Sequence, residues 1–198
     1  MHINDLVELD RRAVAGSVAT VQRVRPGDLG RPTPCADWDL TALLAHMTAQ
    51  HRGFAAAAAG HGADPDVWRE TPADDPVAAY AAAAEAVTAA FATPAERFVL
   101  PEITRAPDFP AAQAIGFHLV DYVVHGWDVA AALGVPYPED DAVLAAALDV
   151  ARAVPDGAAR TAPGSAFAPS LATPPEASTM DTILALLGRD RASFPLKA

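Results

Sequence analysis

Hydrophobic residues recur every three or four positions through several long segments, which is the pattern of helices with one buried face. Alanine, the strongest helix former, fills many of the remaining positions, whereas β-branched and aromatic strand formers are sparse. The chain is therefore expected to be all-α. The pattern predicts helices over residues 3–24, from 37–39 to 60, 76–92, 110–133, 142–153 and 179–187.

Several turn signals support these boundaries. Asp75 followed by Pro76 provides an N-cap and a proline at the first helical position, and Gly134 provides a left-handed stop. An extended stretch is expected around residues 98–103. Residues 155–178 are rich in proline, alanine, serine and glycine, so we expect a long ordered loop that wraps the surface.

Four substantial helices joined by short to medium loops favour antiparallel neighbours, and a four-helix bundle is the simplest arrangement. The length of 198 residues fits one domain. We expect that domain to span residues 1–198, with the bundle core in residues 1–153. Residues 154–198 then form a C-terminal wrap with the last helix.

The net charge is −11, from 25 acidic and 14 basic residues. Such a surface repels phosphate groups, which disfavours nucleic acid and membrane surfaces as partners. No apolar run approaches the roughly 20 residues of a membrane-spanning helix, and the N-terminus lacks the features of a signal peptide. We therefore expect a cytoplasmic protein, and its charge and composition leave open whether it is a monomer or a homodimer.

The predicted helix over residues 110–133 carries the densest polar group. Asp121 and His125 are four residues apart, so their side chains share one face. His118 precedes His125 by seven residues and falls within about 20° of it around the helix axis. Burying such groups unpaired in apolar surroundings costs several kcal/mol each. A divalent metal ion is one partner that would satisfy them.

The second predicted helix supplies a third ligand. His46 lies beside the apolar stripe of this helix and should point inward or to the edge of that stripe. His51 lies roughly 140° further around the axis and should face elsewhere. His46, Asp121 and His125 thus form a candidate metal site, with His118 as an alternative or supporting ligand. Two imidazoles and one carboxylate leave coordination positions open for water or substrate, which is the pattern of catalytic sites.

Other roles fit the same residues. A helical histidine is more often a core or surface residue than a ligand, and an Asp–His pair four residues apart can be a hydrogen-bonded couple without metal. The single cysteine, Cys35, cannot form an intramolecular disulfide. It precedes a helix N-terminus, which can lower a thiol pKa, although packing under the turn is the commoner role. No side chain stands out as a general base, so the catalytic residues are unassigned.

Residues 32–46 (PTPCADWDLTALLAH) and 121–130 (DYVVHGWDVA) resemble two motifs of the mycothiol-dependent maleylpyruvate isomerase N-terminal domain family. Residues 184–190 are similar to the ending of a short branch of that family. The family belongs to the DinB-like (YfiT-like) metal-binding four-helix bundles. The resemblance therefore implies a DinB-like bundle, here with extra C-terminal helices.

The resemblance also implies ligands. His46 matches the histidine ligand of the second helix, Asp121 matches an acidic ligand that is glutamate in the isomerase, and His125 matches the second histidine ligand. His118 has no assured counterpart. Imidazole with carboxylate suits zinc, which we expect first, with nickel or iron(II) as alternatives.

In function, the resemblance implies a metal-dependent enzyme that uses a low-molecular-weight thiol, mycothiol or another, as cosubstrate. A metal-bound thiolate would attack a small electrophile, giving a transferase or an isomerase. The chain lacks the additional C-terminal domain of the isomerase, so maleylpyruvate itself is not the expected substrate. The alternatives are a non-catalytic metal- or ligand-binding bundle, and a homodimer that packs through alanine-rich faces.

Overall fold

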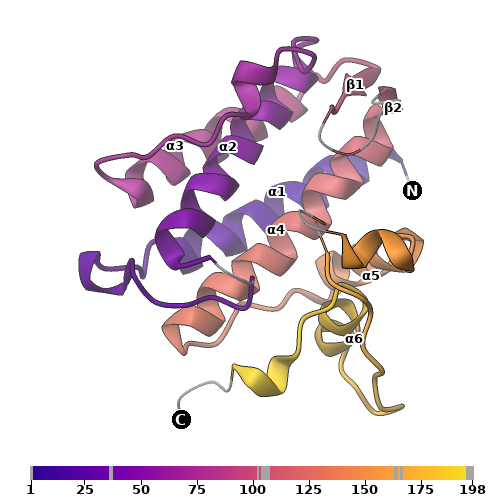
Figure 1. Ribbon diagram of the computed structural model, residues 1–198. Coiled ribbons are helices and arrows are strands. Elements are labelled where there is room, and N and C mark those ends of the chain that lie inside the picture. Colours follow the sequence, from indigo (N-terminus) through magenta and orange to yellow (C-terminus); the bar gives the residue numbers. More distant parts are fainter. Residues whose placement is uncertain are drawn as a thin grey trace.

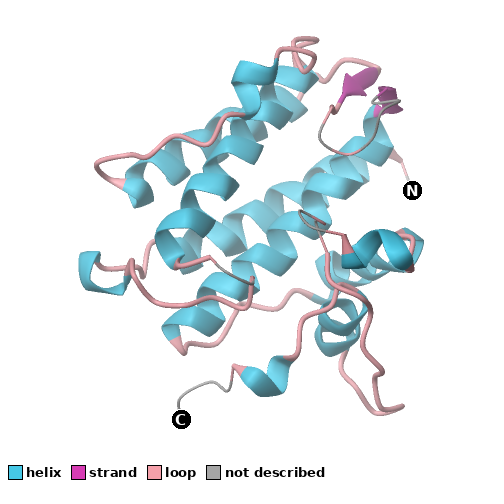
Figure 2. Cartoon of the chain, in the orientation of Figure 1, coloured by secondary structure: helices cyan, strands magenta, loops and turns pink. Residues whose placement is uncertain are grey.

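The computed structural model describes most of the chain, namely residues 2–35, 38–101, 103, 108–162, 165 and 167–194. Its α-helices are α1 (Ile3–Val21), α2 (Leu40–Ala58), α3 (Pro76–Phe91), α4 (Ala111–Leu133), α5 (Asp141–Ala153) and α6 (Thr179–Leu186). The predicted all-α class is confirmed, and every predicted helix is present with its ends displaced by at most a few residues (Figure 2).

The first four helices form the bundle. Helix α1 packs along α4, and α2 packs along α3. The two pairs meet through contacts of α1 with α3 and of α2 with α4 (Figure 1). Helices α5 and α6 pack on each other, and α5 also contacts α4 and α1 outside the bundle. In the part of the chain that the structure describes, no helix has the length and apolarity needed to cross a bilayer.

The helix ends follow the local signals of the sequence. Asp39 caps α2 by accepting a 2.9 Å hydrogen bond from the backbone N–H of Ala42, and Asp75 caps α3 in the same way. Asp37, at the beginning of the range 37–39 where this helix was expected to start, lies outside the described residues. Helix α4 ends at Gly134, whose φ of 70° is left-handed, a conformation that glycine adopts without a steric penalty.

A short two-stranded sheet closes one end of the bundle. Strand β1 (Arg97–Val99) pairs antiparallel with β2 (Asp108–Pro110). The extended stretch expected around residues 98–103 is shorter and begins one residue earlier, and the second strand was not anticipated. Phe98, in β1, is fully buried, with its ring centroid 5.8 Å from that of Phe91 in α3.

The predicted surface loop after α5 is present in the described part of residues 155–178, with one turn of 3-10 helix, η3 (Ala158–Thr161). Arg160 anchors it, because the buried guanidinium donates hydrogen bonds to four backbone carbonyls. The acceptors are Val154, Pro155, Ala168 and Leu186. These bonds attach the loop to the end of α6.

The loop between α2 and α3 is held against α2 by a tight contact. It contains the 3-10 turn η2 (Pro65–Trp68), and the buried Trp68 indole lies on the backbone of Gly53. A Cβ at Gly53 would lie 2.1 Å from the nearest atom of that ring. The ring cannot easily retreat, because its Nε1–H donates a 2.9 Å hydrogen bond to the carbonyl of Gly62. Only glycine lets this loop approach α2 so closely.

We expect Gly53→Ala to destabilise the protein by about 1–3 kcal/mol through overpacking, although alanine is worth up to about 1 kcal/mol more than glycine in a helix. Gly16→Ala in α1 is the matched control, because a Cβ there meets its nearest neighbour at an ordinary 3.7 Å. Urea unfolding followed by circular dichroism measures both variants. Equal stability of the two variants would contradict the packing argument.

Candidate metal centre

Helices α2 and α4 bring the three predicted ligands together. One ligand-capable atom from each of His46, Asp121 and His125 lies within 4.8 Å of the others. Nε2 of His125 is 3.4 Å from Oδ1 of Asp121, and the rings of His46 and His125 are 5.4 Å apart between centroids. The site joins residues more than 70 positions apart in sequence, because α2 and α4 are neighbours in the bundle.

Each of the two histidines is held by a carboxylate. The Nδ1 atom of His46 is 2.9 Å from Oε1 of Glu70, and that of His125 is 2.9 Å from Oδ2 of Asp128. A carboxylate at Nδ1 favours the tautomer that carries its proton there, which leaves the Nε2 lone pair for a metal. The same arrangement is common around metal-ligating histidines.

One pair of the candidate ligand atoms already has the spacing that a bound metal ion imposes. A tetrahedral zinc ion with bonds of about 2.0–2.2 Å keeps its ligand atoms roughly 3.3–3.5 Å apart. The 3.4 Å between His125 and Asp121 already has this value. Since two imidazole nitrogens and one carboxylate oxygen are also the ligand types that zinc accepts, the residues present fit a divalent metal ion.

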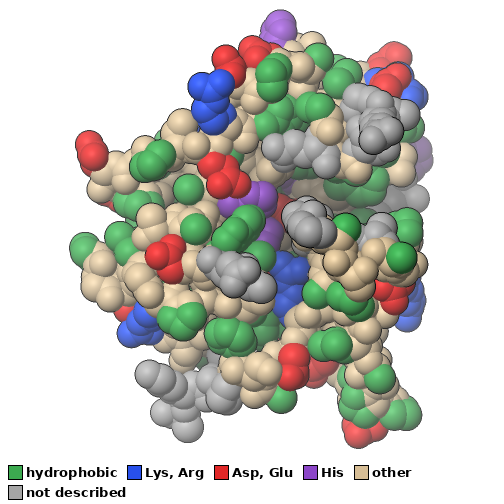
Figure 3. All heavy atoms as spheres, viewed as in Figure 1, with side chains coloured by type: hydrophobic (Ala, Val, Ile, Leu, Met, Phe, Trp, Pro, Cys, Tyr) green, Lys and Arg blue, Asp and Glu red, His purple; other side chains and the backbone are tan. Residues whose placement is uncertain are grey.

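The site opens to solvent on one side. The side chains of His46 and Asp121 are 19% and 22% exposed, whereas that of His125 is only 6% exposed. The ring of Trp38 lies against both imidazoles, 4.6 Å from His46 and 6.4 Å from His125 between centroids. In Figure 3, histidine side chains reach the surface near the middle of the face of the molecule that is drawn. A small molecule could therefore reach the candidate ligands beside an aromatic wall.

Several residues of the site were not anticipated as such: Trp38, Glu70, Asp128 and Arg189. Asp128 had a signal, because it follows His125 by three residues on the same helix, the spacing at which side chains meet. Glu70 lies in the loop between α2 and α3, and Arg189 follows α6, so no local pattern pointed to either. Only the packing of the loop and of the C-terminal segment brings them to the histidines.

Asp128 is fully buried, which alone would raise its pKa. The charge of Arg189 and the hydrogen bonds from His125 and Arg189 oppose burial and hold the pKa of Asp128 below its ordinary value. Nη2 of Arg189 is 3.2 Å from Oδ2 of Asp128. At neutral pH His125 therefore faces a carboxylate anion.

Cys35 lies beside this group without taking part as an anion. Its Sγ is 3.9 Å from Nη2 of Arg189, and burial raises the pKa of the thiol to about 11 despite that positive charge. The lowered thiol pKa considered from its place before a helix is wrong. Cys35, His125 and Asp128 form a second group of ligand-capable atoms within 4.8 Å. The guanidinium of Arg189, 3.9 Å from the thiol sulfur and 3.2 Å from Asp128, disfavours a second cation there.

His118 lies in a different cluster from the candidate ligands. It shares the angular position of His125 but lies about 10 Å away along the helix axis, since seven residues rise by 1.5 Å each. Its Nδ1 is 2.7 Å from Oδ1 of Asp10 in α1, and its Nε2 is 3.1 Å from Nδ1 of His51. Both ring nitrogens are thus engaged, so the structure does not place His118 as a ligand or beside one.

Comparison with known proteins identifies the family. The model of the mycothiol maleylpyruvate isomerase N-terminal domain matches residues 11–130, more than half of the chain. This chain belongs to that family. The family is part of the DinB-like superfamily and is associated with metal binding and mycothiol. The matched region contains His46, Asp121, His125 and their carboxylate partners, but it ends before Arg189.

Two relatives match most of the chain. The uncharacterized proteins MT0763 and Rv0738, from two strains of Mycobacterium tuberculosis (CDC 1551 / Oshkosh and ATCC 25618 / H37Rv), are each 31% identical to this member of the family over 188 residues. The similarity covers 90% of this chain and 94% of each relative. No solved structure matches significantly.

The buried cluster around His118 predicts acid-sensitive stability. Burial, together with the nearby His118, lowers the pKa of His51 well below its usual value. Below about pH 6.5 the unfolded chain therefore binds a proton at His51 that the folded chain does not, and the free energy of unfolding falls by up to about 1.4 kcal/mol per pH unit.

We expect His51→Phe, which keeps a ring against Tyr122, to weaken this pH dependence between pH 6.5 and 5. Urea unfolding of chelator-treated protein at several pH values measures it. The exposed His61 provides the control, and His61→Ala should keep the wild-type slope. An unchanged slope in His51→Phe would show that His51 is not responsible.

Proposed function

We propose that His46, Asp121 and His125 bind one divalent metal ion, zinc in the first instance and nickel or iron(II) as alternatives, and that a small thiol of the mycothiol type reacts at this site. The observation that supports it is the paired arrangement: imidazoles from two helices, each oriented by its own carboxylate, converge on a third ligand. Family membership points in the same direction.

Three residues would bind the ion, and three neighbouring residues would orient or shield them. Nε2 of His46, Nε2 of His125 and the carboxylate of Asp121 would hold the ion, while Glu70 and Asp128 keep both rings in the correct tautomer. Trp38 shields one side of the site from water. When bound, such an ion supplies Lewis acidity that lowers the pKa of a thiol and keeps it as a thiolate at neutral pH.

The proposed class of substrate follows from family membership. A pocket of about 240 Å³ lies beside Trp38 and is lined also by Gly30, Pro32, Thr33 and Asp39, but not by the three candidate ligands. The proposed reaction is the attack of the thiolate on a small electrophile, as in a transferase or an isomerase, by a cytoplasmic protein whose partners are small molecules. The alternative is a bundle that binds metal or a ligand without catalysis.

Protein purified without a nickel column should carry about one divalent ion per chain in elemental analysis. His46→Ala should lose it, because removal of a ligand costs more than the 10–100-fold in affinity that is typical of removing a ligand's hydrogen-bond partner. His61→Ala removes an exposed histidine and should keep the ion. A folded wild-type protein that takes up neither zinc, nickel nor iron(II) would overturn the metal proposal.

A thiol should stabilise only the metal-loaded form. At a concentration about 100 times its dissociation constant, N-acetylcysteine should raise the melting temperature by roughly 5–10 °C. N-acetylserine, which lacks the sulfur, and chelator-treated protein serve as controls and should show no shift. If the metal-loaded protein responds to neither N-acetylcysteine nor mycothiol, the non-catalytic bundle is the correct alternative.

A further inference from the structure

The segment after α6 carries an arginine, Arg189, whose side chain is buried in the interior. Gly188 has a φ of 77°, and a Cβ there would lie 2.6 Å from Cβ of Ala168, so the turn requires glycine. The next residue, Arg189, donates its backbone N–H to the carbonyl of Leu184. Its side chain is only 5% exposed and points towards α4. The chain therefore places a guanidinium beneath the metal centre.

This guanidinium is held on several sides. Nη1 donates a 3.1 Å hydrogen bond to the carbonyl of Leu187, and Cζ lies 5.7 Å from the centroid of the Phe167 ring. Nη2 donates to Oδ2 of Asp128 at 3.2 Å. The same Oδ2 accepts the 2.9 Å hydrogen bond from His125. One oxygen atom thus links Arg189 to the candidate ligand.

The two carboxylates that hold the histidines differ in their burial, and this difference explains why only one of them needs an arginine. Glu70, which holds His46, is 49% exposed, so its charge stays in contact with the solvent. Asp128, which holds His125, is fully buried, so its charge needs a partner within the protein. Among the described residues, Arg189 is the cation that pairs with it.

A contribution to folding stability does not by itself explain why Arg189 and Asp128 form a buried ion pair. Buried ion pairs are often no more stabilising than apolar residues of similar volume. This one also leaves Oδ1 of Asp128 and Nε of Arg189 without a hydrogen-bond partner in the described structure. The two atoms on the path to His125, Nη2 of Arg189 and Oδ2 of Asp128, are both hydrogen-bonded.

We infer that Arg189 is a positioning residue of the metal centre, which it reaches through Asp128 to fix the ring of His125. The inference rests on the proposed metal site. Since Arg189 lies outside the matched residues 11–130, the C-terminal segment would then be part of the functional unit. Removing the guanidinium would leave a buried carboxylate unpaired, and Asp128 would no longer hold the imidazole in place.

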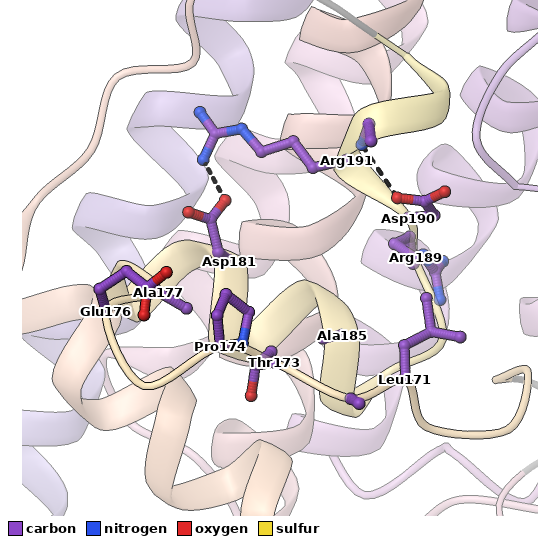
Figure 4. Close-up of a pocket in the computed structure, with 12 residues that line it drawn as sticks. Leu171, Thr173, Pro174, Glu176, Ala177, Asp181, Ala185, Arg189, Asp190 and Arg191 are labelled. Atoms are coloured by element: carbon purple, nitrogen blue, oxygen red, sulfur yellow. Dashed lines mark hydrogen bonds and ion pairs between the residues drawn. The ribbon is translucent and has the colours of Figure 1, made fainter.

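The same segment offers a matched control. Arg191 pairs with Asp181 at 2.7 Å beside a pocket of about 320 Å³, as Figure 4 shows, and its side chain is 36% exposed. Arg191 also lies 3.7 Å from Glu139, so Arg191→Gln removes both of these arginine–carboxylate pairs from the C-terminal segment without touching Asp128.

The test is the zinc affinity of the full chain, measured by competition with a chromophoric chelator at a temperature where each variant is folded. Arg189→Gln should weaken zinc binding about 10–100-fold, in line with the loss of other groups that orient ligands. Arg189→Lys, which keeps the charge, should recover much of this loss, and Arg191→Gln should bind as the wild type does.

A double variant that combines Arg189→Gln with Asp128→Asn tests whether Arg189 acts on the metal site through Asp128. If Arg189 acts through Asp128, the double variant should bind zinc as Asp128→Asn does, and a further loss would contradict the inference. This comparison also serves if Arg189→Gln alone does not fold, because the double variant has no unpaired buried charge. Wild-type affinity in Arg189→Gln overturns the inference alone, whereas a wild-type protein that binds no zinc overturns the proposed function.

Discussion

The candidate site depends on the hydrogen bond between Nδ1 of each histidine and a carboxylate. An imidazole has two similar nitrogens, and without such a bond either could carry the proton and the ring could turn. Glu70 and Asp128 remove this ambiguity for His46 and His125. The loop between α2 and α3 places Glu70, and Arg189 pairs with Asp128, so two segments outside the bundle helices support these carboxylates.

The bundle keeps two polar groups apart within an apolar interior. One group, around His125, is open to solvent on the side of His46 and Asp121, and its three candidate ligand atoms lie within 4.8 Å of one another. The other, around His118, is closed, and its imidazoles bond to each other and to Asp10. His118 and His125 lie on the same helix but have different surroundings, because different residues lie beside α4 at these two points along its axis.

Parts of the chain outside the four bundle helices complete the site. The loop between α2 and α3 is fixed by Trp68 on Gly53 and presents Glu70. The segment after α6 turns at Gly188 and presents Arg189. Both contacts need a glycine at the point of closest approach, since any side chain there would push the segment away from the bundle. Elements that pattern analysis treats as connections therefore set the chemistry of the candidate ligands.

The sequence by itself determined the helices and their ends, because apolar spacing, alanine content and caps such as Asp75 and Gly134 act within a few residues. It also indicated His46, Asp121 and His125, since two of them share a helix face and the surrounding motifs resemble those of a known family. Tertiary structure alone decided the partners: Glu70 and Arg189 for the site, and Asp10 and His51 for His118. These contacts join segments that are distant in the chain, and their geometry depends on how far along its axis each helix is placed, which periodicity does not specify.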